Sequence, residues 1–176
     1  SVRGGDRVAE DAAWHFPNSP VDALREGVRF DWQAMDAWFE EDEEVFVHPR
    51  DPFKRVDVLN SSRHVEVVVN GVRVADSHQP RLLFETSLPV RYYMPLVDLR
   101  LDLLRPSEKT SRCPYKGTAT YWSVEAGGEV FPDLVWCYRA PVLESAKIAG
   151  LACFFNERVD LYVDGVVQER PVTPFS

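Results

Sequence analysis

Alternating apolar and polar positions dominate the chain between residues 64 and 103. His64–Asp76 contains two valine-rich runs on either side of Asn70-Gly71, a dipeptide typical of the two-residue turn of a β-hairpin. Val97–Leu103 alternates apolar and charged residues with a period of two, as a half-buried strand does, and would turn its charged side chains to solvent. These patterns predict antiparallel β structure in this part of the chain.

The other predicted elements are short and end near prolines or glycines. Thr118–Val124 and Leu134–Tyr138 flank two consecutive glycines and predict a second hairpin, and Asp164-Gly165 predicts a third turn. Only Val21–Glu26 and Leu143–Ala149 favour short helices, and each is followed by a glycine suited to a helix C-terminus. The remaining predicted strands are 82–86, 91–94, 151–155 and 159–163.

Residues 1–44 carry a pattern that returns, in order, at residues 123–167. Trp14 matches Trp136 and Asp36 matches Asp160. The offset rises from 122 (136 minus 14) to 124 (160 minus 36), as a two-residue insertion in a loop would produce. The other matching pairs are Ser1/Ser123, Val2/Val124, Asp11/Asp133, Phe16/Tyr138, Phe30/Phe154 and Trp38/Tyr162. A repeat of this kind is considered before other signals, because missing it would assign the domains wrongly.

The repeat predicts four parts of the chain. Residues 1–45 form the C-terminal half of a first repeat, 46–63 a linker, 64–168 a complete second repeat and 169–176 a tail. A half unit leaves strand edges unpaired and half a core uncovered. We therefore expect residues 1–44 to be covered by an upstream segment, by the 64–168 unit or by a second molecule in a homo-oligomer.

The fold class follows from these elements and from the prolines. Thirteen prolines divide the 176 residues into many short pieces, which disfavours a helical bundle. We predict a mainly β fold: a compact tent-like or barrel-like antiparallel β domain with one or two short helices, plus the partial preceding repeat.

Composition narrows the possible partners. A formal charge of -8 and a pI near 5.0 argue against electrostatic capture of nucleic acid. No run approaches eighteen apolar residues, so no membrane span is predicted.

The three cysteines, Cys113, Cys137 and Cys153, are odd in number and form no CxxC pair, which favours a reducing cytoplasm over a disulfide framework. The acidic run Glu40–Glu44 is interpreted as a solvated turn or edge, with a cation site as the alternative.

Several sequence blocks occur in order between residues 64 and 167: His64-Val65, Asn70-Gly71-Val72, Ala75-Asp76-Ser77, Leu83-Phe84-Glu85-Thr86, Arg91-Tyr92-Tyr93, Cys113-Pro114-Tyr115-Lys116-Gly117, Tyr121-Trp122-Ser123-Val124 and Ile148-Ala149-Gly150. Together they resemble the family called domain of unknown function 427. The resemblance implies a small, mainly β domain with a tent-like or barrel-like fold. Residues 1–59 are similar to the end of a preceding copy with its connector, a tandem layout that occurs in actinobacterial members. The resemblance implies no established activity, and a fold alone gives none.

Glu85, Cys113 and Lys116 are the candidate catalytic residues. Glu85 shares its side-chain parity with Leu83, so an internal position would favour its protonated form, as in general acids and bases. On an outer face it would only pair with Arg81 or Arg91. A lysine three residues from a thiol can favour the nucleophilic thiolate, whereas the alternative for Cys113–Gly117 is a proline-fixed turn with a small apolar cysteine.

Large amphipathic rings supply candidate ligand-binding residues. Such rings either fill a β core, with their polar groups bonded internally, or line a cleft for a planar ligand. Trp14 keeps the position of Trp136 while His15 replaces Cys137, which favours a scaffold role for Trp136 and argues against Cys137 as a nucleophile. The candidates in the ligand interpretation are Arg91, Tyr92, Tyr93, Tyr115, Trp122 and Trp136.

The remaining motifs exclude common chemistries. The four histidines, at 15, 48, 64 and 78, have no zinc-binding spacing, and no GxxxxGK[ST], GxGxxG or GxSxG motif occurs. We predict no metal and no evident cofactor. The predicted function is a small-molecule or protein binding module with an aromatic pocket. The alternative is an enzyme acting on a small metabolite, using Glu85 with Cys113 or Lys116.

Overall fold

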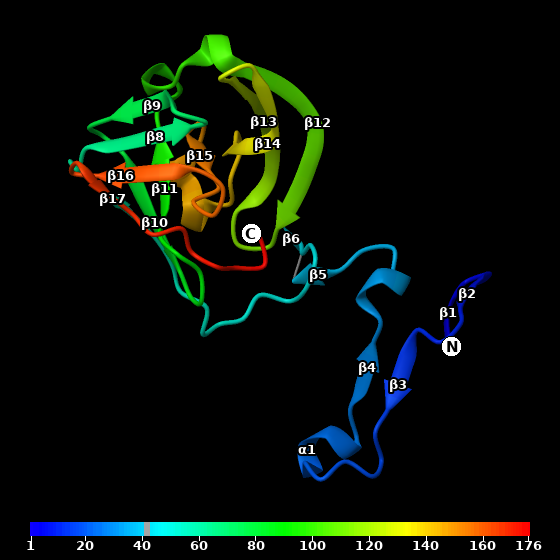
Figure 1. The fold of residues 1–176 in the computed structure, drawn as a ribbon. Coiled ribbons are helices and arrows are strands. Elements are labelled where there is room, and N and C mark those ends of the chain that lie inside the picture. Colours follow the sequence, from blue (N-terminus) through cyan, green and yellow to red (C-terminus); the bar gives the residue numbers. More distant parts are fainter. Residues whose placement is uncertain (41–42) are drawn as a thin grey trace. The chain divides into compact units, whose positions relative to one another are not determined.

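A computed structural model describes residues 1–40 and 43–176 and divides the chain into two units, Ser1–Pro49 and Arg50–Ser176 (Figure 1). Both units consist mainly of antiparallel strands with a few helical turns, which confirms the predicted mainly β class. No sheet of the described residues closes into a barrel. Within the same residues, no helix is both long enough and apolar enough to cross a membrane.

The larger unit contains two antiparallel sheets (Figure 1). The seven-stranded sheet runs β12 (Leu104–Cys113), β13 (Gly117–Ala126), β14 (Glu129–Tyr138), β15 (Ala152–Phe154), β11 (Arg91–Met94), β10 (Arg81–Glu85), β7 (Val56–Asn60). The four-stranded sheet runs β17 (Val166–Val167), β16 (Asp160–Val163), β8 (Val65–Val69), β9 (Val72–Ser77). β7 lies within the predicted linker and pairs with β10, so the sheet begins before residue 64.

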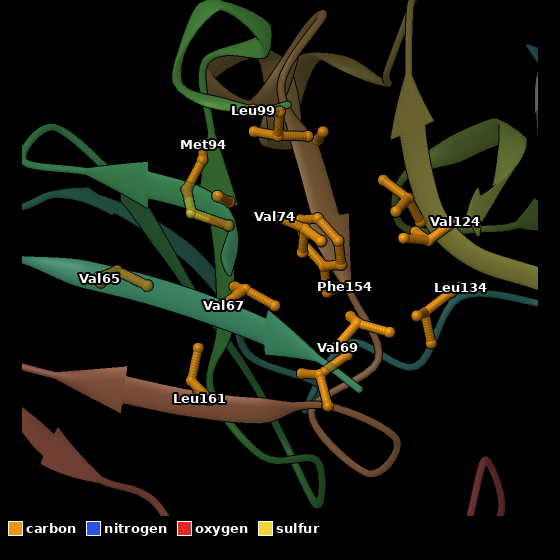
Figure 2. Packing of buried hydrophobic residues seen from close by; sticks show 14 of the residues in the cluster. Val65, Val67, Val69, Val74, Met94, Leu99, Val124, Leu134, Phe154 and Leu161 are labelled. Atoms are coloured by element: carbon orange, nitrogen blue, oxygen red, sulfur yellow. The ribbon is translucent and has the colours of Figure 1, made fainter. Parts of the chain in front are cut away.

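The main core lies between the two sheets (Figure 2). β8 alternates buried and half-buried residues, so Val65, Val67 and Val69 face inward, as its period of two predicts. From the seven-stranded sheet, Met94 and Phe154 meet them. The predicted hairpin between β8 and β9 is confirmed, and its turn residues Asn70 and Gly71 have φ of 48° and 75°. Positive φ at both central residues is what the two-residue hairpin turn requires.

The strand predicted for Val97–Leu103 is wrong. This segment forms two 3₁₀ turns, η2 (Leu96–Asp98) and η3 (Leu101–Leu103). Between them Leu99 is buried, whereas Val97 and Leu101 are 82% and 53% exposed. The alternation therefore did not produce a half-buried strand face, because only Leu99 and Leu103 of its four apolar residues contact the core. The short helix predicted for Leu143–Ala149 forms as a 3₁₀ helix, η4 (Leu143–Ile148), followed by Gly150 at φ 71°.

The smaller unit contains three short antiparallel pairs. They are β1 (Val2–Gly4) with β2 (Arg7–Ala9), β3 (Ala13–His15) with β4 (Val28–Phe30), and β5 (Phe39–Glu40) with β6 (Glu43–Glu44). The helical turns are α1 (Asp22–Arg25) and η1 (Trp32–Ala34). The middle of the acidic run at 40–44 lies outside the described residues, so its predicted role as a turn or cation site stays a prediction.

Two hairpins of the smaller unit have the same register as two hairpins of the larger unit. Val2 pairs with Ala9 as Val124 pairs with Phe131, and Trp14 pairs with Arg29 as Trp136 pairs with Cys153. Asp11 and Asp133 both adopt φ 51°, in the left-handed region that non-glycine residues seldom enter.

The surroundings of these hairpins differ. Trp136 and Phe154 are 7% and 2% exposed, whereas Trp14 and Phe30, at the matching positions, are 42% and 43% exposed. The two copies of the pattern therefore share strand pairing but not burial.

Candidate functional site

The candidate site lies on the face of the seven-stranded sheet that does not contact the main core. Directly opposed residues of paired strands share a face, and the pairs Tyr93↔Cys153 and Cys153↔Trp136 cross three strands. Arg91 lies two residues before Tyr93, so it shares this face. We call this the second face. Its buried residues include Leu83, Tyr93, Tyr121, Trp136, Tyr138, Ile148 and Cys153.

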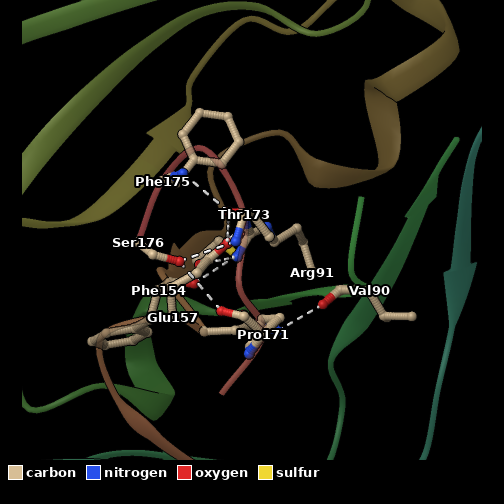
Figure 3. Close-up of polar contacts among 10 residues, drawn as sticks. Val90, Arg91, Phe154, Glu157, Pro171, Thr173, Phe175 and Ser176 are labelled. Carbon is tan, nitrogen blue, oxygen red and sulfur yellow. Dashed lines mark hydrogen bonds and ion pairs between the residues drawn. The ribbon is translucent and has the colours of Figure 1, made fainter. Parts of the chain in front are cut away.

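A buried ion pair lies on the second face (Figure 3). Both Nη atoms of Arg91 donate to the carboxylate of Glu157, each at 2.7 Å. The two side chains are 6% and 0% exposed. The hydroxyl of Thr173 donates to the same carboxylate at 2.6 Å. Glu157 follows β15, so this bond links the sheet to the C-terminal tail.

The charges of this pair stabilise each other. Burial alone would raise the pKa of Glu157, but hydrogen bonds from Arg91 and Thr173 more than offset it and hold that pKa below its usual value. Burial likewise opposes the charged form of Arg91, yet the bonds to Glu157 raise the pKa of the guanidinium overall. Both groups therefore remain ionised in the neutral pH range.

Aromatic rings enclose the guanidinium of Arg91. Its Cζ lies 5.6 Å from the centroid of Trp136 and 5.8 Å from that of Phe175. Phe155 packs against both rings, with centroids 4.5 Å and 6.1 Å away. Trp136 Nε1 donates to the hydroxyl of Tyr93 at 2.9 Å, and burial raises the pKa of that phenol well above its usual value.

A second ion pair joins the two ends of the seven-stranded sheet. Lys116, in the turn between β12 and β13, donates to Glu85 on β10, and the side chains are 11% and 6% exposed. The sheet must curve for these elements to meet, since three strands separate β13 from β10. Glu85 therefore has the internal position that was one of the two alternatives considered from the sequence. Its partner is Lys116 and not Arg81 or Arg91.

The cysteines differ in their surroundings. Burial raises the pKa of the Cys153 thiol to about 12 and also raises the pKa of Cys137, so both are inert at neutral pH. Cys113, at the end of β12, is half-buried. It lies near Tyr138, whose pKa is raised first by burial and then by Cys113, Tyr121 and Glu85.

The six candidate ligand-binding residues do not gather in one place. Arg91, Tyr93 and Trp136 meet on the second face, whereas Tyr92 and Trp122 pack against the main core. Tyr115 lies in the β12–β13 turn, where its hydroxyl accepts a hydrogen bond from the backbone N–H of Asp51 at 2.7 Å.

Three residues of the site gave no signal in the sequence. Glu157 stands in a short loop, and Thr173 and Phe175 stand in a segment that reads as an irregular tail. Arg91 and Glu157 are 66 residues apart, so no local periodicity relates them. A basic residue inside an otherwise apolar strand was the one available hint that a buried partner exists.

Some described residues outside the second face could hold a metal ion. His64, Asp76 and His78 each place one donor atom within 4.8 Å of the others. This arrangement differs from the sequence-based expectation of no metal site.

Comparison with known proteins identifies the family. A family model described as a domain of unknown function (DUF427) matches residues 57–165. The match begins in β7 and ends just after β16, so it covers most strands of both sheets of the larger unit. No curated protein matches the chain. Because the matched residues make up more than half of the chain, the protein belongs to the DUF427 family.

Proposed function

We propose that the protein is a binding module whose ligand site is formed by Arg91, Glu157 and Trp136 on the second face. The observation that carries this proposal is the position of the chain's own tail, which lies against Arg91 and Glu157 as a bound peptide would (Figure 3). Thr173 contributes a hydroxyl to Glu157, and Phe175 contributes a ring to Arg91.

The contacts of Thr173 and Phe175 with the ion pair are individually weak, which supports exchange with an external ligand. Phe175 is 48% exposed, and an exposed cation–π contact contributes about 0.5–1 kcal/mol. The Thr173 hydroxyl adds one bond to a charged acceptor, worth about 1.5–3 kcal/mol. The loss of backbone freedom in the tail opposes both contributions.

The chemistry of the site defines the ligand class. Arg91 and Glu157 neutralise each other, so the site favours a ligand without net charge at the contact. The rings of Trp136 and Phe155 and one carboxylate oxygen of Glu157 suit an aromatic group beside a hydroxyl or amide donor. A peptide with a Thr-Pro-Phe pattern supplies both groups, as does a small aromatic alcohol.

A shortened chain ending at Arg170 is expected to bind a capped peptide of residues 171–176 saturably, as measured by titration calorimetry. The Phe175→Ala peptide should bind about 2–5-fold more weakly and the Thr173→Ala peptide about 10–150-fold more weakly, because they lose about 0.5–1 and about 1.5–3 kcal/mol of contact. The full chain is the matched control and should bind the peptide less well, since its own tail competes. Equal binding of the three peptides would contradict the proposal.

The enzyme alternative has narrower support. Glu85 and Lys116 form an ion pair, and Cys113 and Glu85 both lie near Tyr138. However, the ammonium of Lys116 is already bound to Glu85, so a catalytic cycle would have to break a largely buried ion pair. Binding is therefore the function that we favour.

We also propose that Ser1–Pro49 is the second half of another copy of the domain and binds a polypeptide segment equivalent to residues 56–122. The matching registers of two hairpins and the shared left-handed aspartate support this relationship. In the larger unit, β13 and β11 flank Trp136 and β8 covers Phe154, whereas Trp14 and Phe30 are exposed at the matching positions of the smaller unit. A groove of about 840 Å³ lined by Phe16, Leu24 and Val28 adds to this uncovered surface.

Adding a second copy of residues 56–122 ahead of Ser1 should protect the backbone amides of residues 13–15 and 28–30 from hydrogen exchange, because their strands gain a paired neighbour. The control is an extension of the same composition in scrambled order. Equal exchange in the two extended chains would overturn the proposal. Protection of these amides in the unextended chain, together with a dimer by light scattering, would instead assign the surface to a second copy.

A further inference from the structure

Two histidines and an aspartate meet at one end of the β8–β9 hairpin. His64 precedes β8, Asp76 lies in β9, and His78 follows β9. His64 Nε2 lies 2.7 Å from Asp76 Oδ1. The rings of His64 and His78 stack with their centroids 4.0 Å apart.

The hairpin itself brings these residues together. Val65 pairs with Ser77, so continuing the ladder by one step places His64 opposite His78. Glu66 pairs with Asp76, which puts the aspartate on the same face, two residues before His78. Asp164 fixes the main chain of His64. The Asp164 side-chain Oδ1 accepts from the His64 N–H at 3.0 Å, and the Asp164 backbone N–H donates to the His64 carbonyl at 2.8 Å.

We propose that His64, Asp76 and His78 form a binding site for a divalent transition metal such as Zn²⁺. Imidazole nitrogen and carboxylate oxygen are the donors that Zn²⁺, Co²⁺ and Ni²⁺ share. Two ligands of a tetrahedral Zn²⁺ stand about 3.4 Å apart when each bond is about 2.1 Å. The three donor atoms already lie within 4.8 Å of one another, so small side-chain rotations close the site.

Neighbouring charges orient the aspartate without neutralising the site. Arg73 Nη1 lies 3.0 Å from Asp76 Oδ2, the oxygen that does not contact His64, and 2.7 Å from Glu66 Oε1. Outer partners of this kind fix the direction of a ligating carboxylate. With three protein ligands, the metal keeps a coordination position for water or a further ligand. The site uses the four-stranded sheet and is independent of the tail-covered second face.

Equilibrium dialysis of the metal-free full chain against Zn²⁺, with metal content measured by mass spectrometry, tests the proposal. The wild type should take up one equivalent of Zn²⁺. His64→Ala and His78→Ala should each weaken binding more than tenfold, because loss of a residue that only supports a metal ligand already costs about tenfold or more. His15→Ala and His48→Ala replace the other two histidines and should bind as the wild type does.

A second measurement separates this site from the thiols. The visible spectrum of bound Co²⁺ should show nitrogen and oxygen ligation and should persist after the cysteines are alkylated. Circular dichroism should show that the variants are folded, since His64 is only half-buried and His78 is exposed. No uptake by the wild type, equal uptake by a His64→Ala/His78→Ala variant, or loss of binding on alkylation would each overturn the proposal.

Discussion

Replacing Glu157 with glutamine is expected to lower the free energy of unfolding of the Arg50–Ser176 unit by about 3–5 kcal/mol, because the charge of Arg91 would then be buried without a counter-charge. The carboxylate is fully buried and accepts three hydrogen bonds, two from Arg91 and one from Thr173. Glutamine keeps the shape but offers only one acceptor oxygen and no charge. Urea unfolding followed by circular dichroism measures the difference.

Asp102→Asn is the matched control. Arg100 forms the same two-bond contact with Asp102, at 2.8 Å and 2.7 Å, but their side chains are 57% and 60% exposed. Water replaces the lost bonds there, so stability should change little. A double variant, Arg91→Met with Glu157→Leu, should recover much of the loss, since it removes both buried charges. A Glu157→Gln variant as stable as the control would show that the pair is not buried in solution.

The same pair gives stability a defined pH dependence. The pKa of Glu157 is lower in the folded protein than its usual value of 4.5, so the folded state releases this proton more readily than the unfolded state. The resulting stabilisation is complete above the unfolded pKa and is lost as the pH falls through the folded value. Glu157→Gln should lack this part of the acid dependence, which urea unfolding between pH 2 and pH 6 measures.

Elements that depend on neighbouring residues could be predicted from the sequence. The β8–β9 hairpin follows from Asn70-Gly71 and the flanking valines, because turn chemistry and strand period agree. Val97–Leu103 has the same period but no such agreement, and contacts with β9 hold it as 3₁₀ turns: Val74 O accepts from Arg100 N–H at 2.9 Å. Tertiary contacts therefore decided the structure where local signals were ambiguous.

The candidate site was predictable only by face, not by partner. Side-chain parity placed Glu85 with Leu83, and the structure buries that face. The partner, Lys116, comes from the opposite end of the sheet, which depends on sheet curvature that no short pattern encodes. The His64–His78 contact is the reverse case. It is implied by the predicted hairpin register, although a search for metal-ligand spacing along the chain does not find it.

The largest difference between two matching positions is expected for the tryptophans. Trp136→Ala should lower the free energy of unfolding by about 3–5 kcal/mol, the usual cost of a cavity of this size. Trp136 is 7% exposed, contacts Phe155 and Arg91, and donates a hydrogen bond to Tyr93. Trp14→Ala removes the same side chain from the same strand register but from a site that is 42% exposed. It should change stability by only about 0.5 kcal/mol.

Urea unfolding followed by circular dichroism compares the two variants, because each loses part of the fluorescence signal. Trp136→Phe separates the contributions: the smaller ring retains contact, whereas Tyr93 loses its hydrogen-bond donor, so a loss of about 1–3 kcal/mol is expected. Equal costs at Trp14 and Trp136 would mean that the smaller unit is already covered in solution by a partner of the kind that β13 and β11 provide in the larger one. The proposed repeat therefore predicts unequal costs, because strand pairing forms within a hairpin whereas burial of its tryptophan needs the strands that pack around it.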